Sequence, residues 1–296
     1  MRPRGALWAA VTTALGVAAA WTGGARRWHG RTEALQRALS ARRDEPEPAT
    51  YDEDEIAGLP AVVERFFRTA LRPGQPLIAE VRLRQHGTIN LAADGEAWAP
   101  FTSSQRVVAR RPAFAWDAVV VMGHVVPVRV HDAYVGGEGR TEAALLGLVP
   151  VADVGGTAAA AEAQLVRFLA EAAWCPTVLL PSQGVEWRAV DEHRAEATLL
   201  DGSTAATVVF AFADDGRIES VHAAARGRTV DGTLVPTPWG GRFTDHAERS
   251  GMQVPLRAEV FWELPDGEQP YWRGRVDAID YVWTRGSRPV DPLPAF

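Results

Sequence analysis

Apolar and polar residues alternate with a period of two in two stretches of the chain, Glu80 to Arg84 and Val126 to Val130. This alternation is typical of a β-sheet that has one face against the core and the other in water. Similar runs recur on both sides of residues 157–180, and the connections between them are too short to hold crossover helices. The pattern therefore predicts an antiparallel, meandering sheet. Its strands are predicted at residues 77–91, 96–109, 114–122, 125–135, 140–149, 185–190, 194–200, 204–212, 217–225, 242–249, 253–264 and 271–283.

Helical periodicity predicts two helices within this part of the chain, at residues 59–73 and 157–174. The first has apolar residues three and four positions apart and a proline in its first turn. The second is rich in Ala, begins at Thr157 as a suitable N-cap, and places Arg167 and Glu171 outside its apolar face. Both helices have an apolar face that must pack against something.

These elements predict an α+β fold in which a strongly curved, mainly antiparallel sheet wraps around the central helical insert as a half-barrel. The concave side of such a sheet forms a cleft that holds a small ligand where side chains leave it open. We expect residues 56–296 to form a single soluble curved-sheet domain, preceded by an N-terminal membrane helix.

The membrane helix is predicted from the uncharged, Ala-rich stretch Ala6 to Thr22. Its length is close to the lower limit of about 17 residues for a span, so residues 1–25 are predicted to be a transmembrane anchor or an uncleaved signal. We expect a single-pass protein of the cell membrane, with the side of the soluble domain left open. Cleavage near Ala20 followed by secretion is the alternative, because Ala18-Ala19-Ala20 offers small residues for processing.

Residues 26–55 are predicted to connect this segment to the domain. Trp28 to Arg43 has Leu35 and Leu39 on one face, which predicts a juxtamembrane helix whose arginines meet anionic lipid. The following stretch from Asp44 to Glu55 is acidic and contains prolines, which predicts a solvated linker.

Composition excludes several function classes. A net charge of −6 argues against a nucleic-acid partner, because phosphate binding needs a concentrated positive surface. The chain has no Lys, which removes Schiff-base and P-loop lysine chemistry, and its one cysteine, Cys175, cannot form an intramolecular disulfide or a four-cysteine zinc site. No histidine or serine spacing matches a metal or nucleophile motif. We therefore expect no metal, no cofactor and no catalytic residue, and a non-enzyme is favoured although the question stays open.

Residues 236–243 are the most distinctive stretch, because two prolines and two glycines surround Trp239 and Arg242. In a functional interpretation both side chains lie at the cavity mouth, where Arg242 binds an anionic head group. In a structural interpretation Arg242 stacks on Trp239 or pairs with Glu259 or Glu263. The tryptophans elsewhere fit either the core or the cleft. The candidate ligand-binding residues are Trp116, Trp174, Trp187, Trp239, Arg242, Glu259 and Tyr271.

Several motifs resemble a bacterial family of unknown function whose members often begin with a hydrophobic segment. The resemblance covers residues 59–283 and implies an identity without an activity. In this chain the family positions fall on Glu171, Trp174, Pro176, Pro181, Trp187, Pro238, Trp239, Gly241, Phe243, Pro255, Tyr271 and Arg273. His246 stands where the family pattern has an aromatic Tyr. More loosely, residues 243–255 are similar to a hairpin of periplasmic lipoprotein carriers, which are half-open antiparallel barrels capped by helices.

These observations favour a membrane-tethered, non-catalytic protein that binds a lipid or other amphipathic small molecule in a sheet-lined cavity. The first alternative is a structural or protein-interaction module of the cell envelope that uses an exposed sheet edge. A less favoured alternative is a hydrolase-type enzyme with Glu171, Glu186, Asp245 or Glu259 as acid or base.

Overall fold

The computed structural model of the chain describes residues 4–92, 95–123, 125–230 and 232–284, with side chains from Thr22 onward. These residues form three α-helices and one sheet of 13 strands. The helices are α1 (Arg4–Arg42), α2 (Ala61–Ala70) and α3 (Ala158–Glu171). The strands are β1 (Ile78–Asn90), β2 (Trp98–Val108), β3 (Ala113–Met122), β4 (Val126–Val135), β5 (Glu138–Leu145), β6 (Val149–Gly155), β7 (Val185–Ala189), β8 (Arg194–Asp201), β9 (Thr204–Phe212), β10 (Ile218–Val230), β11 (Thr233–Arg249), β12 (Met252–Leu264) and β13 (Gly267–Trp283).

The sheet is built from two meanders that meet in its middle. Its strand order is β6-β5-β4-β3-β2-β1-β13-β12-β11-β10-β9-β8-β7, and every pairing given for it is antiparallel. The first meander runs outward from β1 to β6, the second runs inward from β7 to β13, and β1 pairs with β13 from Ile78↔Trp283 to Ile89↔Trp272. The predicted antiparallel meander is confirmed. Because each connection within a meander is a local hairpin, hydrophobic alternation and turn residues are enough to predict it.

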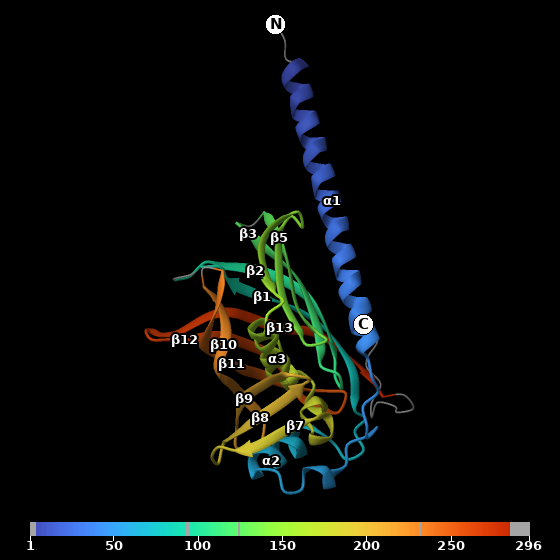
Figure 1. Cartoon of the computed structure of the whole chain (residues 1–296), viewed down its shortest axis with the longest axis vertical. Helices are drawn as coiled ribbons and strands as arrows, with labels where there is room; N and C mark the ends of the chain where they lie inside the picture. The colour runs from blue at the N-terminus through green and yellow to red at the C-terminus, as the bar shows by residue number, and fades with distance from the viewer. Residues whose placement is uncertain (1–3, 93–94, 124, 231, 285–296) are drawn as a thin grey trace.

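Helix α3 lies inside the curve of the sheet and contacts strands of both meanders, chiefly β5, β9 and β10 (Figure 1). Thr157 is its N-cap, as predicted, and accepts a hydrogen bond from the Ala160 backbone N–H at 3.2 Å. Gly139 of β5 lets the helix approach closely, because a Cβ at this position would collide with the Ala160 carbonyl. The helix thus fills the gap between the two meanders.

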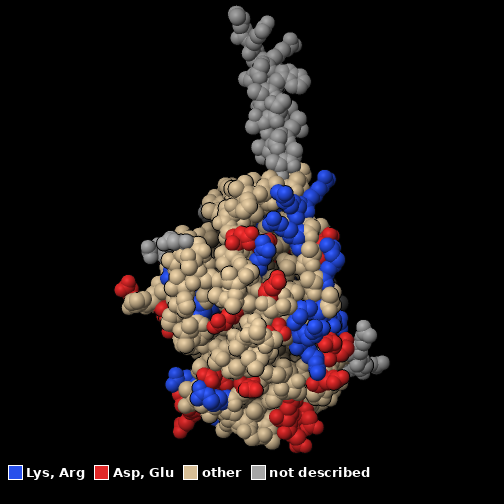
Figure 2. All heavy atoms as spheres, in the orientation of Figure 1, with Lys and Arg blue, Asp and Glu red and all other residues tan. Residues whose placement is uncertain are grey.

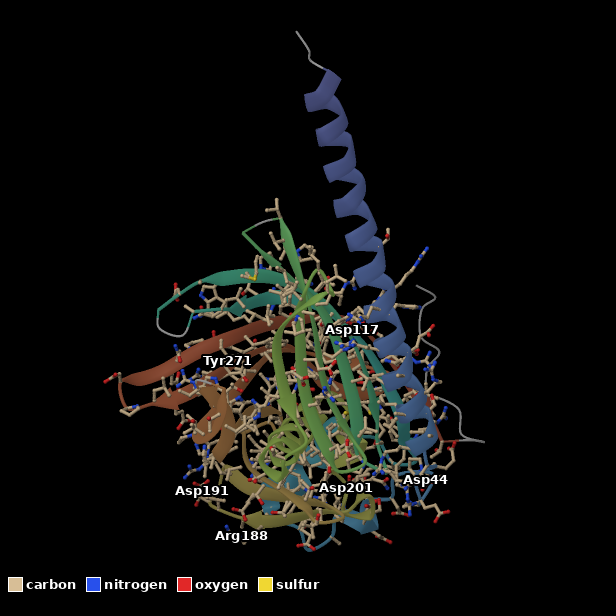
Figure 3. All side chains as sticks on the ribbon, turned by 45° about the horizontal axis from the view of Figure 1, so that its top comes forward. Asp44, Asp117, Arg188, Asp191, Asp201 and Tyr271 are labelled. Carbon is tan, nitrogen blue, oxygen red and sulfur yellow. The ribbon has the colours of Figure 1, made fainter. Side chains whose placement is uncertain are left out.

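The C-terminal part of α1 packs on the outer face of the sheet. Leu39 is fully buried among residues of β2, β3 and β4, and Trp28 stacks on His131 of β4 with their ring centroids 4.1 Å apart. Trp28 Nε1 also donates a hydrogen bond to Asp117, which lies beside α1 in Figure 3 (3.2 Å). The helix predicted at the membrane surface is therefore packed against the domain, because Leu35 and Leu39 cover an apolar strip of the sheet and Trp28 contacts polar side chains beside it.

The predicted acidic linker is also packed on the domain. Tyr51 is 2% exposed, and Thr50 forms an isolated antiparallel bridge with Pro76 just before β1. The polar composition of this stretch did not indicate that the Tyr51 side chain is buried. The predicted boundary at Ile56 thus separates two segments that the structure holds together.

Several strand boundaries differ from the prediction. The run at 140–149 divides into β5 and β6, because Leu146 and Gly147 adopt positive φ and turn the chain back. Strand β11 begins at Thr233 instead of residue 242, although Pro236 and Pro238 lie within it. Before Trp239, β11 pairs only with β10, so one of its edges is open there and tolerates the missing proline N–H groups.

The predicted transmembrane segment at residues 1–25 lies mostly outside the residues whose side chains are described. The backbone of helix α1 is described from Arg4 onward. Within the described part of the chain, none of the helices has both the length and the apolar character needed to cross a membrane.

Candidate functional site

A cavity of about 700 Å³ lies between the concave face of the sheet and α3. This volume is within the roughly 300–1,000 Å³ range of small-molecule sites. Apolar side chains from both meanders and from α3 line most of it. They include Ile89, Leu91, Val120, Met122, Val128, Val130, Ala143, Leu145, Val151, Val154, Ala160, Ala170, Val221, Leu234, Phe243, Ala258, Val260 and Trp272. The cavity can therefore hold a largely apolar molecule of drug or lipid size.

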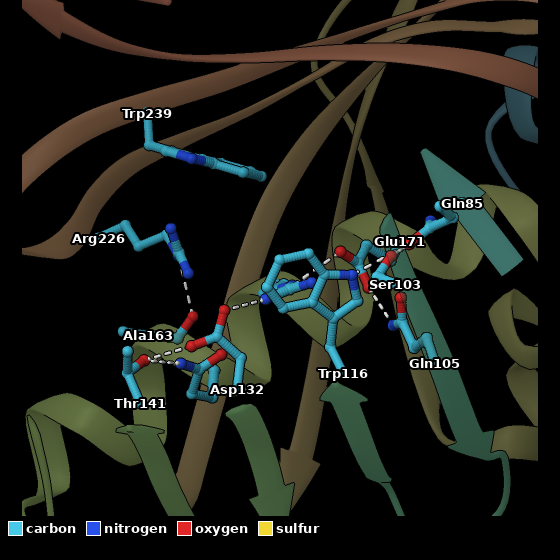
Figure 4. Close-up of polar contacts among 12 residues, drawn as sticks. Gln85, Ser103, Gln105, Trp116, Asp132, Thr141, Ala163, Glu171, Arg226 and Trp239 are labelled. Carbon is cyan, nitrogen blue, oxygen red and sulfur yellow. Dashed lines mark hydrogen bonds and ion pairs between the residues drawn. The ribbon is translucent and has the colours of Figure 1, made fainter. Parts of the chain in front are cut away.

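One ion cluster interrupts this apolar lining. Arg167 of α3 donates to Asp132 of β4 at 2.5 Å and to Glu171, one turn along the helix, at 2.7 Å (Figure 4). Its guanidinium also lies over the Phe114 and Trp116 rings, 5.2 and 5.1 Å from their centroids. The side chain of Arg167 is 13% exposed. Burial disfavours its charged form, but the carboxylates of Glu171 and Asp132 outweigh burial and hold the pKa of Arg167 above its usual value.

Neutral side chains satisfy the remaining oxygens of this cluster. Gln105 donates to Glu171 and Thr141 donates to Asp132, both at 2.5 Å. Gln164 in turn donates to the Thr141 hydroxyl at 3.0 Å. Because both carboxylates bind the same guanidinium and each also accepts a hydrogen bond from a neutral donor, the cluster fixes α3 to the sheet with all four oxygens bonded. One guanidinium beside two carboxylates leaves the cluster a formal charge of −1.

A second arginine borders the cavity in a different environment. The Arg226 guanidinium lies over the indoles of Trp239 and Trp262, 5.1 and 5.7 Å from the ring centroids. It donates to the Ala163 carbonyl at 3.0 Å and to the Tyr271 hydroxyl at 3.2 Å. Trp239 Nε1 donates to the same hydroxyl at 2.9 Å. Within residues 22–92, 95–123, 125–230 and 232–284, Arg226 forms no ion pair with a carboxylate. The wall here carries a positive charge that only neutral groups contact.

Four of the residues predicted from the sequence come together at this cavity. Trp116, Trp174, Trp239 and Tyr271 all line it. Trp116 Nε1 donates to Gln85 at 3.1 Å, and Tyr271 stacks on Trp262 with ring centroids 5.4 Å apart. Whether they contact a ligand stays a prediction.

The other three predicted residues lie elsewhere. Trp187 packs against Phe210 and donates a hydrogen bond to the Leu179 carbonyl at 2.9 Å. It does not line the cavity. Arg242 and Glu259 face each other across β11 and β12 on the outer face of the sheet, 3.5 Å apart. The reason is strand parity, because Gly241 and Phe243 point into the cavity and Arg242 between them must point out. The geometry therefore agrees with the structural interpretation, in which Arg242 pairs with Glu259.

Sequence reasoning missed Arg226 and misplaced Arg167. The predicted strand ended at Ala225, and a register shift between Ala223 and Arg226 turns the Arg226 side chain toward the cavity. Arg167 was expected outside the apolar face of its helix, yet the sheet surrounds that helix on several sides. The spacing of Arg167 and Glu171, four residues apart, was a usable signal for an ion pair on α3.

The acid and base candidates are dispersed. Glu171 borders the cavity, where Arg167 and Gln105 bind it, and Glu186 is exposed on β7. Asp245 pairs with Arg275 at 2.6 Å, and Glu259 pairs with Arg273 at 2.6 Å on the outer face. In the part of the chain that the structure describes, no three His, Cys, Asp or Glu side chains are grouped to hold a metal ion.

Comparison with known proteins gives a family and no activity. A model of a family of unknown function, DUF6920, matches residues 57–281. No curated protein matches the chain. Among solved structures, the chain is similar to a LolA superfamily protein from Nitrosomonas europaea, with 12% identity and a TM-score of 0.30 over 79% of this chain and 94% of that chain. The family match spans α2 and nearly the whole sheet, which confirms the resemblance to a family of unknown function. The chain therefore belongs to DUF6920.

Proposed function

We propose that this protein is a non-catalytic binder of one amphipathic molecule, whose apolar chain fills the cavity and whose acidic head group binds Arg226. The observation that carries the proposal is an apolar cavity of about 700 Å³ with an arginine on its wall that no described carboxylate neutralises. A ligand with one anionic head and an apolar tail matches both features.

The environment of Arg226 supports an acidic head group in particular. The guanidinium lies over two indole faces, and its N–H groups donate to two neutral acceptors, the Ala163 carbonyl and the Tyr271 hydroxyl. In such a partly desolvated position, a hydrogen bond to a carboxylate or phosphate is stronger than the same bond in water. A neutral amphiphile of the same length gains less from this group.

The cavity carboxylates support a binding role more than a catalytic one. Asp132 and Glu171 both accept hydrogen bonds from Arg167, and each accepts a second bond from a neutral side chain. A general acid or base must contact its substrate through a free oxygen, and all four oxygens of these two carboxylates already accept a hydrogen bond within the cluster.

We further propose that the stretch Ala6 to Thr22 tethers the domain to the cell membrane, where amphipathic ligands are concentrated. The side of the membrane on which the domain lies is left open, and secretion after cleavage near Ala20 is the alternative. Mass spectrometry of the mature N-terminus together with membrane fractionation of cells distinguishes the two.

Lipid extraction from the purified full chain tests the proposed function. Val130 and Ala143 face each other on β4 and β5, and both line the cavity, so Val130→Trp combined with Ala143→Trp fills it. Thr207→Phe adds a ring to the exposed face of β9 and serves as the control. We expect wild-type protein and the control to retain about one amphipathic molecule per chain, identified by mass spectrometry, and the filled variant to lose it. Equal lipid in all three proteins, or none in any of them, contradicts the proposal.

A further inference from the structure

The cavity opens toward one end of the sheet, where five hairpins turn. In an antiparallel meander, alternate turns lie at the same end. The β1–β2, β3–β4, β5–β6 and β10–β11 turns therefore share an end with the β12–β13 turn. The curvature of the sheet carries the β8–β9 turn away from this end, since Asp201 beside that turn accepts hydrogen bonds from Arg42 and from Tyr134 near the other end of β4. Cavity-lining residues Leu91, Met122 and Val151 belong to three of these hairpins and are also exposed, so they mark the mouth.

Exposed apolar side chains gather on these hairpins. We call them the rim: Leu91, Met122, Val125, Val126, Val149, Val151, Val230 and Val235. Their exposed fractions run from 37% to 76%. Six of the eight lie on the β1–β2, β3–β4 and β5–β6 hairpins, which are neighbours in the sheet, and Val230 and Val235 lie on the β10–β11 hairpin, beyond the polar tip of the β12–β13 hairpin. Exposed apolar groups of this kind mark membrane or protein contacts.

The chain before the domain leaves at the same end. Gly24 of α1 packs against Leu146 and Leu148 in the β5–β6 turn, next to rim residues Val149 and Val151. In Figure 1, α1 continues past the ends of β3 and β5, away from the sheet. The uncharged stretch Ala6 to Thr22 precedes this contact in the sequence, so any bilayer that holds it lies at the rim end of the domain.

Positive charge accompanies the rim on its α1 side. Arg26 and Arg27 are exposed on α1, within one turn of Gly24, and Figure 2 shows blue side chains gathered at the base of the grey N-terminal segment. Arginines at this level match the anionic phosphates of a membrane surface. Apolar tips beside basic side chains fit a lipid bilayer better than a protein partner that would have to cover four separate hairpins.

We propose that the rim docks onto an anionic lipid bilayer, so that the cavity mouth faces the membrane and the ligand passes between lipid and cavity without crossing water. The inference rests on the proposed function, because a mouth that faces lipid is useful only if the cavity takes an amphipathic ligand. The occupant of the rim is the bilayer itself, and the ligand comes from the bilayer leaflet that the rim contacts.

A spin-label experiment on the full chain tests the docking. Cys175 is buried, and burial raises the pKa of its thiol, so a nitroxide reagent modifies an introduced surface cysteine selectively. Val151→Cys and Val235→Cys place the label on two sides of the mouth. Val190→Cys places it on another exposed valine, beside the β7–β8 turn at the opposite end of the sheet. The labelled chains are reconstituted into vesicles of equal parts phosphatidylethanolamine and phosphatidylglycerol.

We expect the labels at positions 151 and 235 to be accessible to oxygen and shielded from a water-soluble nickel complex, and the label at 190 to show the reverse. Equal exposure of all three labels to the nickel complex overturns the proposal. Shielding at 151 and 235 from both reagents also overturns it, because it would mean that protein covers the rim.

Ligand transfer separates a failure of docking from a failure of the proposed function. In the double variant Val149→Asp and Val235→Asp, which changes two rim residues that do not line the cavity, we expect uptake of a fluorescent fatty acid from the same vesicles to slow about tenfold or more, with affinity for the soluble fatty acid unchanged. Val190→Asp is the control and keeps the wild-type rate. Unchanged uptake by the rim variant overturns the docking proposal alone, whereas no binding of the soluble fatty acid by any protein overturns the proposed function.

Discussion

The Arg226 guanidinium lies 5.1 Å from the centroid of the Trp239 indole, and both side chains donate a hydrogen bond to the Tyr271 hydroxyl. The three residues come from β10, β11 and β13, so the arrangement depends on the register of the second meander. It holds a cation at an apolar wall while leaving it without a carboxylate among the described residues. The affinity and specificity of the cavity should depend on this group.

Replacement of Arg226 should weaken the binding of acidic ligands selectively. A charge-assisted hydrogen bond contributes about 1.5–3 kcal/mol, so Arg226→Gln should lower the affinity for oleate at least about tenfold. The affinity for oleyl alcohol, measured by the same calorimetric titration, should change little.

Arg242→Gln is the matched control, because Arg242 lies on the outer face and pairs with Glu259 and Glu268. It should leave the affinity for oleate unchanged. If the two variants bind oleate equally well, the assignment of the head-group site to Arg226 is wrong.

The ion cluster at α3 should make a large contribution to stability. Arg167→Met leaves the carboxylates of Asp132 and Glu171, which are 18% and 19% exposed, without their cation. Breaking a buried pair from one side costs about 3–5 kcal/mol, which should appear as a lower free energy of unfolding in urea. Arg188→Met breaks an exposed pair with Glu196 and should cost less than about 1 kcal/mol. Similar losses in both variants would mean that the cluster is as well solvated as the surface pair.

His246 should make the domain less stable in mild acid. Burial lowers the pKa of His246 from 6.5, the nearby Arg217 guanidinium lowers it further, and its buried Nε2 has no hydrogen-bond partner among the described residues. The folded state therefore prefers neutral imidazole, and the unfolded chain binds the proton first as the pH falls below about 6.5. The contribution of neutral His246 to the free energy of unfolding is therefore complete above about pH 6.5. It decreases as the pH falls toward the lower pKa that His246 has in the folded state.

The variant His246→Tyr replaces the imidazole by an aromatic ring that stays neutral in this pH range, and it should remove that part of the acid-induced loss. The comparison is the change in unfolding free energy between about pH 7.5 and about pH 5.5 in wild type and variant. His86→Gln, which changes an exposed histidine beside Asp277, is the control. If the free energy of unfolding of the His246→Tyr protein falls with pH as much as that of wild type, the assignment of this acid sensitivity to His246 is wrong.

The close approach of α3 to the sheet should not tolerate a side chain on β5. A Cβ at Gly139 would collide with the Ala160 backbone, so Gly139→Ala should lower the unfolding free energy by roughly 1–3 kcal/mol. Gly30 lies in α1, where a Cβ would have no neighbouring atom within 4 Å, and Gly30→Ala should instead stabilise the helix by about 1 kcal/mol or less. Thermal unfolding of the two variants shows whether Gly139→Ala lowers the stability of the domain and Gly30→Ala raises it. A neutral Gly139→Ala variant would mean that α3 moves easily against β5.

The sequence predicted those features that depend on local patterns. Hairpins join neighbouring strands, so alternation and turn residues were enough for the antiparallel meanders, and Thr157 was identifiable as the N-cap of α3 by its position before an apolar helix. Trp116, Trp174, Trp239 and Tyr271 converge on one cavity because a curved sheet brings distant strands around its central helix.

Features that depend on exact register or on long-range packing could not be predicted in this way. A shift of one residue reverses the face of a strand. Parity along β11 directs Arg242 to the outer face and a register shift in β10 directs Arg226 to the cavity, and the local sequence pattern shows neither. The contact of Trp28 with His131 joins positions about one hundred residues apart, and nothing in the local pattern of α1 shows which face of which strand it covers.

Photo-crosslinking tests the central claim, occupation of the cavity, most directly. The full chain is incubated with a fatty acid that carries a diazirine near the end of its chain, irradiated, digested and mapped by mass spectrometry. The account predicts crosslinks to cavity residues such as Val221, Val260 and Trp272, competed by unlabelled oleate and absent when Val130 and Ala143 are both replaced by Trp. Crosslinks confined to outer-face positions such as Thr207, or unaffected by filling the cavity, would contradict it.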